Sequence, residues 1–372
     1  MSVEREVICS NGSGIVEFTP TKILYAPARG GVSNYSMLEP FIPYVMIDAS
    51  AKSFASNDVH AKFEYLPDKP AFKDMENLTI FFPGGIGDVI CLKACLELLD
   101  TDNSIYPNLK SINMFSTKDD IPIILDGAIK NLDISIMNYP PHYNAIEDSD
   151  AIIGFGPLQR KSMHHELSDT MASILGMPMP KKAPTLIPNE SLKNVLSRHL
   201  KDNGRKKIGI QVYSSAHYRS IPPHMAMWIA MELADLGYDV FIIGITGQRL
   251  KLFENGAFAS LPDNIYDMSG ILSNWLDEFI AFTDLMDGFV TPDTSMVHMA
   301  GSLMKPTIAL FGPTSGQWRT SYYPTVVTMS APAECAPCYN IEKPMNCGKQ
   351  WCDAITGIET SDIVMKLHEL LC

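Results

Sequence analysis

Short apolar runs alternate with amphipathic stretches along most of the chain, and the clearest example lies at residues 288–314. The apolar run at 288–291 predicts a buried strand. The Pro-Asp-Thr-Ser sequence at 292–295 stops that strand and supplies residues that favour a helix N-terminus. An apolar helix through Leu303 and a second strand at 307–311 follow. Strand, turn, helix and strand in this order predict a βαβ unit of a parallel sheet.

The same alternation predicts two α/β domains of the Rossmann type. The first has strands at 78–82, 111–115, 134–136 and 151–154, a helix that runs through Leu99 and a helix at 162–175. The second has strands at 207–212, 239–243, 288–291 and 307–311, with helices at 223–236, at 276–283 and after 295. A proline-rich stretch at 178–188 joins the two domains, because its prolines forbid regular structure.

Residues 1–75 follow a different pattern. Short β-type runs at 15–18, 22–26, 44–48 and 61–66 are separated by Gly, Pro, Ser and Asn clusters, which predicts a small antiparallel extension. We therefore divide the chain into a β-rich extension at 1–75, a first Rossmann-like domain at 76–180, a second at 181–330, and a cysteine-containing tail with a C-terminal helix at 331–372.

Composition places the chain among globular proteins. Its 372 residues are 46% hydrophobic and 19% charged, which suits two domains with sizeable cores. The net charge of −13 argues against binding nucleic acid or anionic lipid through overall charge. The N-terminus carries Glu4 and Glu6 and has no apolar core, so it is not a signal peptide, and no apolar stretch is long enough for a membrane span. We expect a cytoplasmic protein.

Polar residues follow the predicted strands at 288–291 and 307–311. In open α/β sheets, ligands bind beyond the carboxyl ends of strands, where helix N-termini present free N–H groups. These amides could hold a diphosphate, and an aspartate there could accept hydrogen bonds from sugar hydroxyls. Any one of these residues is explained as well by helix capping or core packing, but the whole cluster favours a ligand site. Its members are Asp293, Thr294, Ser295, His298, Gly312 and Thr314.

The sequence PDTSMVHMAGSLMKPTIALFGPT at 292–314 resembles the donor-site signature of the heptosyltransferase-like glycosyltransferase family 9. The resemblance implies a GT-B-like fold, in which the second Rossmann-like domain binds a nucleotide-diphosphate sugar and the first brings the acceptor. The cluster around Asp293 would then bind the donor. Ser295 departs from the family, which usually has glycine there, so a side chain stands beside the expected phosphate.

A glycine-rich loop follows the predicted strand at 78–82. Gly85 and Gly87 let the backbone turn tightly into a helix and approach a ligand. The loop is neither a dinucleotide fingerprint, because Ile90 occupies its last glycine position, nor a P-loop. It resembles the family 9 G-x-[GI]-G-D loop, which implies that Asp88 is the catalytic base and that the two glycines lie on the acceptor side. The alternative is that Asp88 only interacts with the helix dipole.

The loop after the strand at 207–212 carries two serines and an arginine. Its Arg-Ser-Ile-Pro sequence at 219–222 resembles the Lys-x-Trp-Pro of the family, in which the cation meets the donor phosphates. Arginine keeps the charge and adds a fork suited to phosphate oxygens, although a solvated surface charge is the alternative. The resemblance implies further donor-binding residues near the phosphates, ribose or base: Ser214, Ser215, Arg219, Gln248 and Leu272.

Two adjacent histidines, His164 and His165, lie on the helix predicted at 162–175. Neighbouring residues point to different sides of a helix, so the pair cannot ligate one metal as residues four apart do. The helix resembles the one that lines the acceptor cleft in the family. That implies an acceptor-side role, with packing as the alternative.

Four of the eight cysteines gather near the C-terminus: Cys335, Cys338, Cys347 and Cys352. In a cytoplasmic protein they are thiols or metal ligands rather than disulfides. Two pairs with short gaps could supply four thiolates to zinc or iron. The C-x-P-C sequence resembles the tail of many family members. In the branch similar to bacterial autotransporter heptosyltransferases, such a cluster holds iron. A structural metal and four thiols without metal both stay open.

The resemblance implies an inverting glycosyltransferase that needs no catalytic metal. Heptose, with ADP-heptose as its donor, is the first sugar it suggests, and the acceptor hydroxyl belongs to a saccharide, as in lipopolysaccharide, or to a protein. Its partners are this donor and acceptor; nucleic acid is not expected, and the oligomeric state stays open. The alternatives are a transferase with another sugar donor and a non-catalytic sugar-nucleotide-binding or assembly protein. A NAD-dependent dehydrogenase is disfavoured, since no glycine fingerprint with a ribose-binding acid is present.

Overall fold

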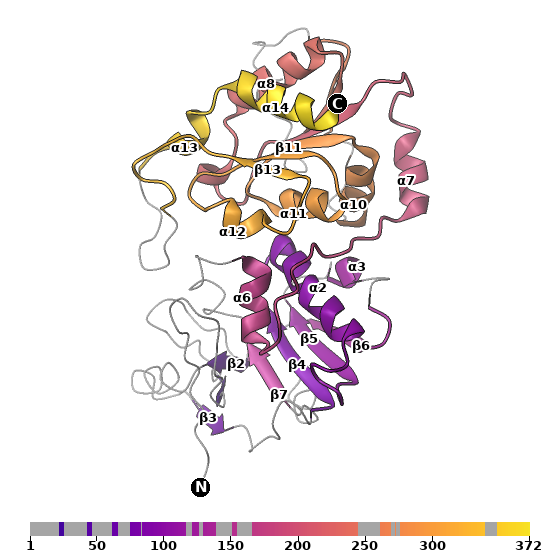
Figure 1. Cartoon of the computed structure of the whole chain (residues 1–372), viewed down its shortest axis with the longest axis vertical. Coiled ribbons are helices and arrows are strands. Elements are labelled where there is room, and N and C mark those ends of the chain that lie inside the picture. The colour runs from indigo at the N-terminus through magenta and orange to yellow at the C-terminus, as the bar shows by residue number, and fades with distance from the viewer. Residues whose placement is uncertain are drawn as a thin grey trace. The chain divides into compact units, whose positions relative to one another are not determined.

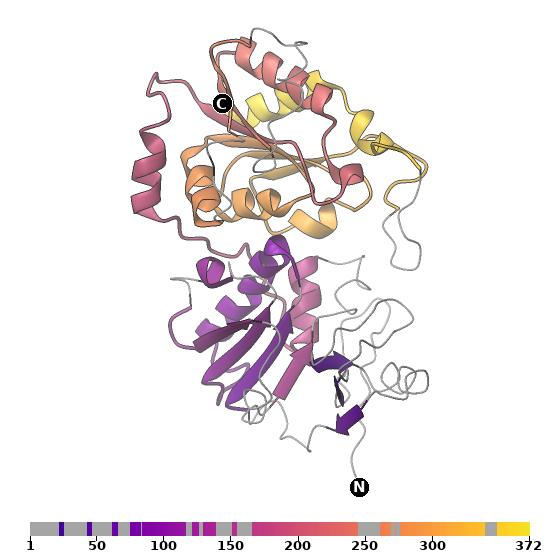
Figure 2. The ribbon, with the colours of Figure 1, turned by 180° about the vertical axis from the view of Figure 1, so that it is seen from behind.

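The computed structural model forms two compact units (Figure 1; Figure 2). One unit comprises residues 1–85, 92–160 and 168–180, and the other comprises residues 86–91, 161–167 and 181–372. The residues that the structure describes are 22–25, 43–46, 62–65, 75–82, 84–116, 121–125, 129–138, 151–154, 166–244, 261–268, 272, 276–338 and 348–372.

A small antiparallel sheet lies in the N-terminal region. It consists of β1 (Lys22–Tyr25), β2 (Pro43–Met46) and β3 (Lys62–Tyr65), in the order β2-β1-β3. Both pairings are antiparallel, as predicted for three of the four β-type runs. The fourth run, at 15–18, lies outside the described residues.

The first unit also holds a parallel sheet with the strand order β6-β5-β4-β7. Its elements are β4 (Asn77–Phe82), α2 (Ile86–Thr101), β5 (Ser111–Ser116), α3 (Ile121–Leu125), β6 (Asp133–Asn138), β7 (Ala151–Gly154) and α6 (Leu167–Ile174). The first turns of α2 group with the second unit. Leu78, Ile80 and Phe82 are completely buried, because alternate residues of a strand point to the same face. The predicted strands of this sheet are confirmed. The described part of the helix predicted at 162–175 begins at Leu167.

The second unit is built on a six-stranded parallel sheet, in the order β10-β9-β8-β11-β12-β13. Its strands are β8 (Lys207–Gln211), β9 (Asp239–Ile243), β10 (Ile265–Asp267), β11 (Gly288–Pro292), β12 (Thr307–Leu310) and β13 (Val326–Met329). Its helices are α7 (Glu190–Ser197), the 3-10 turn η2 (His217–Arg219), α8 (Pro223–Asp235), α10 (Leu276–Leu285), α11 (Ser295–Ser302), α12 (Gln317–Thr320), α13 (Asp353–Thr356) and α14 (Thr360–Leu371). The βαβ unit predicted at 288–311 is β11, α11 and β12.

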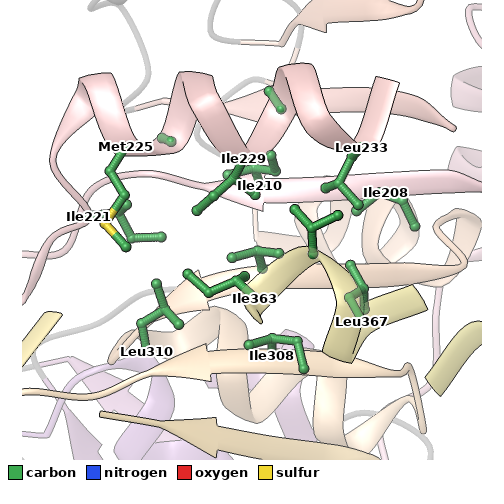
Figure 3. Packing of buried hydrophobic residues seen from close by; sticks show 14 of the residues in the cluster. Ile208, Ile210, Ile221, Met225, Ile229, Leu233, Ile308, Leu310, Ile363 and Leu367 are labelled. Atoms are coloured by element: carbon green, nitrogen blue, oxygen red, sulfur yellow. The ribbon is translucent and has the colours of Figure 1, made fainter. Parts of the chain in front are cut away.

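Helices cover both faces of this sheet: α8 and α14 lie on one face, and α10, α11 and α12 on the other (Figure 1). Figure 3 shows Ile308 and Leu310 of β12 on the α8 and α14 side, close to Ile363 and Leu367 of α14. Phe311, next to Leu310, packs instead against Val297 of α11. Burying each such side chain stabilises the fold by about 1.5–3 kcal/mol, so the two-sided core holds α11 and its N-terminal turn in place.

No helix among the described residues is sufficiently long and apolar to cross a membrane.

Candidate functional site

The order of the strands in the second sheet places two loops side by side. The chain leaves β8 toward β9 and β10 on one side of the sheet, whereas β11 pairs with β8 on the other side and leads to β12 and β13. The carboxyl ends of β8 and β11 therefore meet where the strand order reverses, which is the usual ligand position in open α/β sheets. The loop after β8 carries Ser214 and Arg219, and the loop after β11 carries Asp293.

Asp293 is the centre of the hydrogen bonds that join these loops. Ser214 Oγ donates to the Asp293 carbonyl oxygen at 3.2 Å. Arg219 Nη1 donates to the same carbonyl at 3.3 Å and to Asp293 Oδ2 at 3.4 Å. Thr314 Oγ1, from the loop after β12, donates to Oδ2 at 2.6 Å. The loops after β8 and β12 thus both hold this turn, and each donates one hydrogen bond to its buried carboxylate.

The carboxylate of Asp293 keeps an acceptor for a ligand. Both side-chain hydrogen bonds go to Oδ2, and Oδ1 has no hydrogen-bond partner among the residues that the structure describes. An aspartate oxygen accepts hydrogen bonds only. Asp293 can therefore accept a hydrogen bond from a hydroxyl group of a ligand without giving up those that hold it.

Arg219 lies at the same turn, and both arms of its guanidinium are engaged. Nη1 contacts Asp293, and Nη2 donates to Ser215 Oγ at 2.6 Å. The loop that carries it is closed by Ser220, whose Oγ accepts from the Ser214 amide at 2.9 Å and donates to the Ala216 carbonyl at 3.2 Å. The side chain of Arg219 is 25% exposed, so its positive charge stays accessible beside Asp293. The structure thus places the predicted cation at the turn, paired with the aspartate.

The helix that follows Asp293 begins with a side-chain cap. Thr294 has an extended backbone, with φ −144° and ψ 176°, and its Oγ1 accepts a hydrogen bond from the Met296 amide at 3.2 Å. The Thr291 and Thr294 hydroxyl oxygens lie 3.2 Å apart. Ser295 is the first residue of α11 and is partly exposed. The positive end of the helix dipole therefore lies beside Asp293 and Arg219, a combination that attracts an anion.

His298 lies one turn into α11 and is buried against two other polar side chains. Its Nδ1 is 3.1 Å from the Tyr323 hydroxyl oxygen and 3.4 Å from Cys91 Sγ, and its ring meets the Tyr323 ring edge-on. Burial lowers the pKa of His298 to about 4; the Asp293 charge opposes this change and the Arg319 charge reinforces it. His298 is therefore neutral at pH 7.

Charged residues lie near the buried side chains of His298, Tyr323 and Cys91. Burial raises the pKa of Cys91 well above its ordinary value, and the charges of Glu166 and Asp88 raise it further. Glu166 is itself held, because one of its oxygens accepts from the Ser321 amide at 3.2 Å and from the Ser321 hydroxyl at 2.6 Å. Asp88 lies in the first turn of α2. Cys91 thus stays a neutral thiol.

Sequence reasoning missed several residues of this group: Cys91, Glu166, Arg319 and Tyr323. One local signal does exist. Arg319 and Tyr323 stand four residues apart in and after α12, directly after the loop that holds Thr314. A cation and a hydroxyl following a predicted ligand loop are candidates for the same site.

Two of the predicted glycines are explained by close packing. A Cβ on Gly87 would lie 2.9 Å from His298 Cδ2 and 3.4 Å from Ser295 Cα. Gly87 therefore approaches the start of α11 more closely than any other residue type could. A Cβ on Gly312 would lie 2.6 Å from Cys352 Sγ, so the small residue there is required by packing against the tail. Gly85 is exposed.

Some of the predicted donor-side and acceptor-side residues are not seen at the Asp293 turn or lie outside the described part of the chain. Leu272 is buried, and its amide donates to the Met268 carbonyl at 3.3 Å. Gln248, His164 and His165 lie outside the described residues. Their donor-side and acceptor-side roles stay predictions.

The cysteine tail is described in part. Cys335 is exposed and Cys352 is buried. Burial raises the pKa of Cys352, and the charge of Cys335 adds to this rise. Cys347 lies outside the described residues, and within the described ones no three His, Cys, Asp or Glu side chains come together as metal ligands. The described residues alone do not make a metal site, and the four-cysteine site stays a prediction.

Residues 168–349 match the family model described as glycosyltransferase family 9 (heptosyltransferase). No curated protein sequence matches the chain. This family match covers the Asp293 turn, the Arg219 loop and Tyr323. It confirms the resemblance predicted from the 292–314 signature, and with it the prediction of a glycosyltransferase.

Solved structures with the same fold include three bacterial glycosyltransferases. A glycosyl transferase family 9 protein from Veillonella parvula has 16% sequence identity and a TM-score of 0.60, over 81% of this chain and 98% of that chain. The ADP-heptose lps heptosyltransferase II of E. coli has 16% identity and a TM-score of 0.55, over 79% and 98% of the two chains. The iron-containing dodecameric glycosyltransferase TibC of enterotoxigenic E. coli has 16% identity and a TM-score of 0.59, over 83% and 78%. These likenesses, with the two parallel sheets, confirm the GT-B-like fold class.

Proposed function

We propose that this chain, whose residues 168–349 carry a glycosyltransferase family 9 domain, moves a sugar from a nucleotide-diphosphate sugar to an acceptor hydroxyl on a saccharide or a protein, with inversion and without a catalytic metal. Heptose is the sugar we propose first, because the matched family is described as heptosyltransferase and similar solved structures include E. coli heptosyltransferases. A further similar structure, of the dodecameric iron-containing heptosyltransferase TibC, is a complex with ADP-D-beta-D-heptose.

The observation that carries the proposal is the hydrogen-bonded Asp293 turn. It combines a carboxylate with an available oxygen, the Arg219 guanidinium and the N-terminus of α11 within one set of contacts. A nucleotide-diphosphate sugar offers complementary groups: sugar hydroxyls for the carboxylate and diphosphate oxygens for the cation and the amides. In the proposed complex, Asp293 binds the sugar, and Arg219, Ser214 and the amides of residues 294–296 bind the diphosphate.

The acceptor would be activated by Asp88. In the proposed reaction its carboxylate removes the proton from the acceptor hydroxyl, and the oxygen attacks the anomeric carbon as the bond to the diphosphate breaks. A single in-line displacement inverts the anomeric configuration. The close approach of Gly87 to Ser295 supports this assignment, because it brings the first turn of α2, with Asp88, to the start of α11.

Charge on the leaving diphosphate would be stabilised by the chain itself. Arg219 and the start of α11 supply positive charge in fixed positions, which is the form of stabilisation that contributes most to many enzyme reactions. The charge of Arg319 also acts at this site, since it lowers the pKa of His298. These groups support the proposal that no metal ion is needed for the chemical step.

The test is a panel of nucleotide sugars with the purified protein. We expect thermal stabilisation by one donor, because a ligand that binds only the folded state raises its melting temperature. With that donor and a saccharide or protein acceptor, NMR of the product should show the opposite anomeric configuration from the donor, and the rate should be unchanged by EDTA. A retained configuration, or a rate abolished by EDTA and restored by Mg²⁺, would contradict the proposal.

A further inference from the structure

Tyr323 is packed so tightly that its ring cannot change position. It is buried, and a Cβ on Gly301 would lie 2.5 Å from its Cγ and Cδ1 atoms. Gly301 follows His298 by three residues, on the same side of α11. The tyrosine ring therefore lies directly on the helix, edge-on to the imidazole at a centroid distance of 5.6 Å, and its hydroxyl is held beside Nδ1.

The positions of the protons on His298, Tyr323 and Cys91 can be assigned by counting hydrogen-bond donors and acceptors. A neutral imidazole carries one N–H and one acceptor nitrogen. If Nδ1 is the acceptor, the Tyr323 hydroxyl donates to it at 3.1 Å. If Nδ1 carries the proton, the Tyr323 proton is left with Cys91 Sγ at 4.0 Å, and a thiol sulfur is a weak acceptor. The Ser302 hydroxyl also lies near Tyr323, but its oxygen makes no hydrogen bond of normal geometry within the described part of the chain. The first arrangement satisfies both groups, so the imidazole proton belongs on Nε2.

The other edge of the imidazole lies at the predicted donor site. A Cβ on Gly87 would lie 2.9 Å from His298 Cδ2 and 3.5 Å from Nε2, and the same position is 3.4 Å from Ser295 Cα. Within the described residues, both hydrogen-bonding contacts of the ring are made by Nδ1, so Nε2 has no hydrogen-bond partner there. An N–H at Nε2 is therefore available at the start of α11.

We infer that Tyr323 is a positioning residue, which holds His298 as the tautomer with its proton on Nε2 so that the neutral ring donates a hydrogen bond to an oxygen of the bound nucleotide-diphosphate sugar. The role toward the donor depends on the proposed function, whereas the tautomer does not. An uncharged hydrogen-bond donor suits the start of α11, because Arg219 and the helix N-terminus already supply positive charge there. Tyr323 acts only through the histidine.

The first test is the tautomer itself. Long-range ¹H–¹⁵N NMR of the full chain labelled at histidine distinguishes the two neutral forms, and the His298→Gln variant identifies the signal of His298. We expect the Nε2–H form in the wild type at pH 7, and a mixture or the Nδ1–H form in Tyr323→Phe. The Nδ1–H form in the wild type, or an unchanged tautomer in Tyr323→Phe, would overturn the inference.

A matched control lies elsewhere in the same unit. The Tyr238 hydroxyl is 2.7 Å from Nδ1 of His368, and these rings also meet edge-on. Tyr238→Phe removes the same kind of contact, between the turn that joins α8 to β9 and the helix α14, without touching the predicted donor site. Any loss of function that follows from general damage to a tyrosine–histidine pair should therefore occur in both variants.

The second test is kinetic. We expect Tyr323→Phe to lower kcat/KM for the nucleotide sugar about tenfold, which corresponds to about 1.4 kcal/mol, with Tyr238→Phe within twofold of the wild type. His298→Gln should retain more activity than His298→Leu, because the glutamine amide supplies an N–H. Equal losses in Tyr323→Phe and Tyr238→Phe, or equal losses in the two His298 variants, would overturn the role toward the donor.

The two proposals fail in different ways. If no nucleotide sugar stabilises the wild type or is turned over, the proposed function fails, and the NMR result still decides the tautomer. If the wild type transfers sugar and the tautomer does not depend on Tyr323, only the present inference fails. Gly301→Ala provides a second variant, since its methyl group displaces the tyrosine ring and should change the His298 signal in the same way as Tyr323→Phe.

Discussion

Thr314 donates a 2.6 Å hydrogen bond to Oδ2 of Asp293 across 21 positions of the sequence. Both residues are buried. The bond joins the loop after β12 to the turn after β11, so it fixes the orientation of the carboxylate, whose other oxygen is available to a ligand. If Asp293 binds the donor as proposed, recognition at this turn depends on a hydroxyl that need not touch the substrate.

Replacing Thr314 with valine should weaken donor binding. The substitution keeps the shape of the side chain and removes the hydroxyl, which leaves Asp293 with Arg219 as its only side-chain partner among the described residues. We expect roughly a tenfold rise in the Kd of the nucleotide sugar and a loss of about 1–2 kcal/mol in the free energy of unfolding. Calorimetric titration and urea unfolding measure the two effects.

Thr307→Val is the matched control for this prediction. Thr307 is also buried, and its hydroxyl donates to the Lys305 carbonyl at 2.8 Å, at the opposite end of β12. The Thr307→Val variant should be less stable than the wild type but should bind the nucleotide sugar with unchanged affinity. An unchanged Kd in Thr314→Val, with the same loss of stability as in Thr307→Val, would remove the recognition role of Thr314.

The catalytic activity should fall even when Arg219 is replaced by a residue of the same charge. Its two nitrogens reach Asp293 and Ser215 at once, and a lysine has one point of contact where arginine has a fork. We expect Arg219→Lys to lower kcat/KM about tenfold and Arg219→Gln about a hundredfold, as steady-state rates at several donor concentrations would show. Arg205→Gln removes a half-exposed arginine that pairs with Asp239 at 3.6 Å, so its rates should match the wild type.

A further distinction follows for Arg219. If the guanidinium binds only Asp293 and never the diphosphate, Arg219→Gln should bind free nucleotide diphosphate as tightly as the wild type. If it binds the diphosphate as proposed, this affinity should fall with the catalytic rate. Equal affinities would therefore reassign Arg219 as a support for the Asp293 turn.

Removal of the proposed base should separate binding from turnover. Asp88→Asn keeps the size of the side chain and cannot accept the acceptor proton, so we expect kcat to fall by about 10²–10⁴-fold while the Kd of the donor changes little. Rapid-mixing kinetics and calorimetric titration supply the two numbers. Asp102→Asn, at an exposed carboxylate that accepts from the Ser104 amide and hydroxyl, controls for the loss of a negative charge. Full turnover by Asp88→Asn would exclude it as the base.

The backbone of the site could be predicted from the sequence because its signals are local. The strand at 151–154 and the strand at 239–243 have the predicted bounds, and the strand, cap and helix around Asp293 lie within a few residues of one another. The strand β10 (Ile265–Asp267) was missed, since three residues carry no period and pair only with β9. The helix α7 (Glu190–Ser197) was missed as well, although Asn189 caps it through the Ser191 and Leu192 amides.

The side-chain partners of the site could not be predicted in the same way. Cys91 and His298 are 207 positions apart, and Glu166 and Ser321 are 155 apart. Nothing in the local pattern around Cys91 distinguishes a core residue of α2 from a neighbour of His298. Which buried thiol contacts which imidazole depends on how whole helices and strands pack. The sequence of either segment alone does not contain that information.

The buried imidazole predicts a pH dependence of stability. Burial lowers the pKa of His298 from 6.5 to about 4, with Asp293 opposing and Arg319 reinforcing the change. Between these values the unfolded chain binds a proton that the folded chain does not, so the free energy of unfolding falls as the pH drops below about 6.5. The contribution of His298 to this fall is roughly 2 kcal/mol between pH 7 and pH 5.

His298→Gln should remove that contribution. Urea unfolding at pH 7, 6 and 5 is expected to show a pH-dependent loss of stability about 2 kcal/mol smaller in His298→Gln than in the wild type. His224→Gln, at an exposed position of α8, should behave as the wild type does. If the wild type and His298→Gln lose equal stability over this range, the imidazole is not held neutral by its surroundings, and the hydrogen-bond assignment with Tyr323 loses its electrostatic basis.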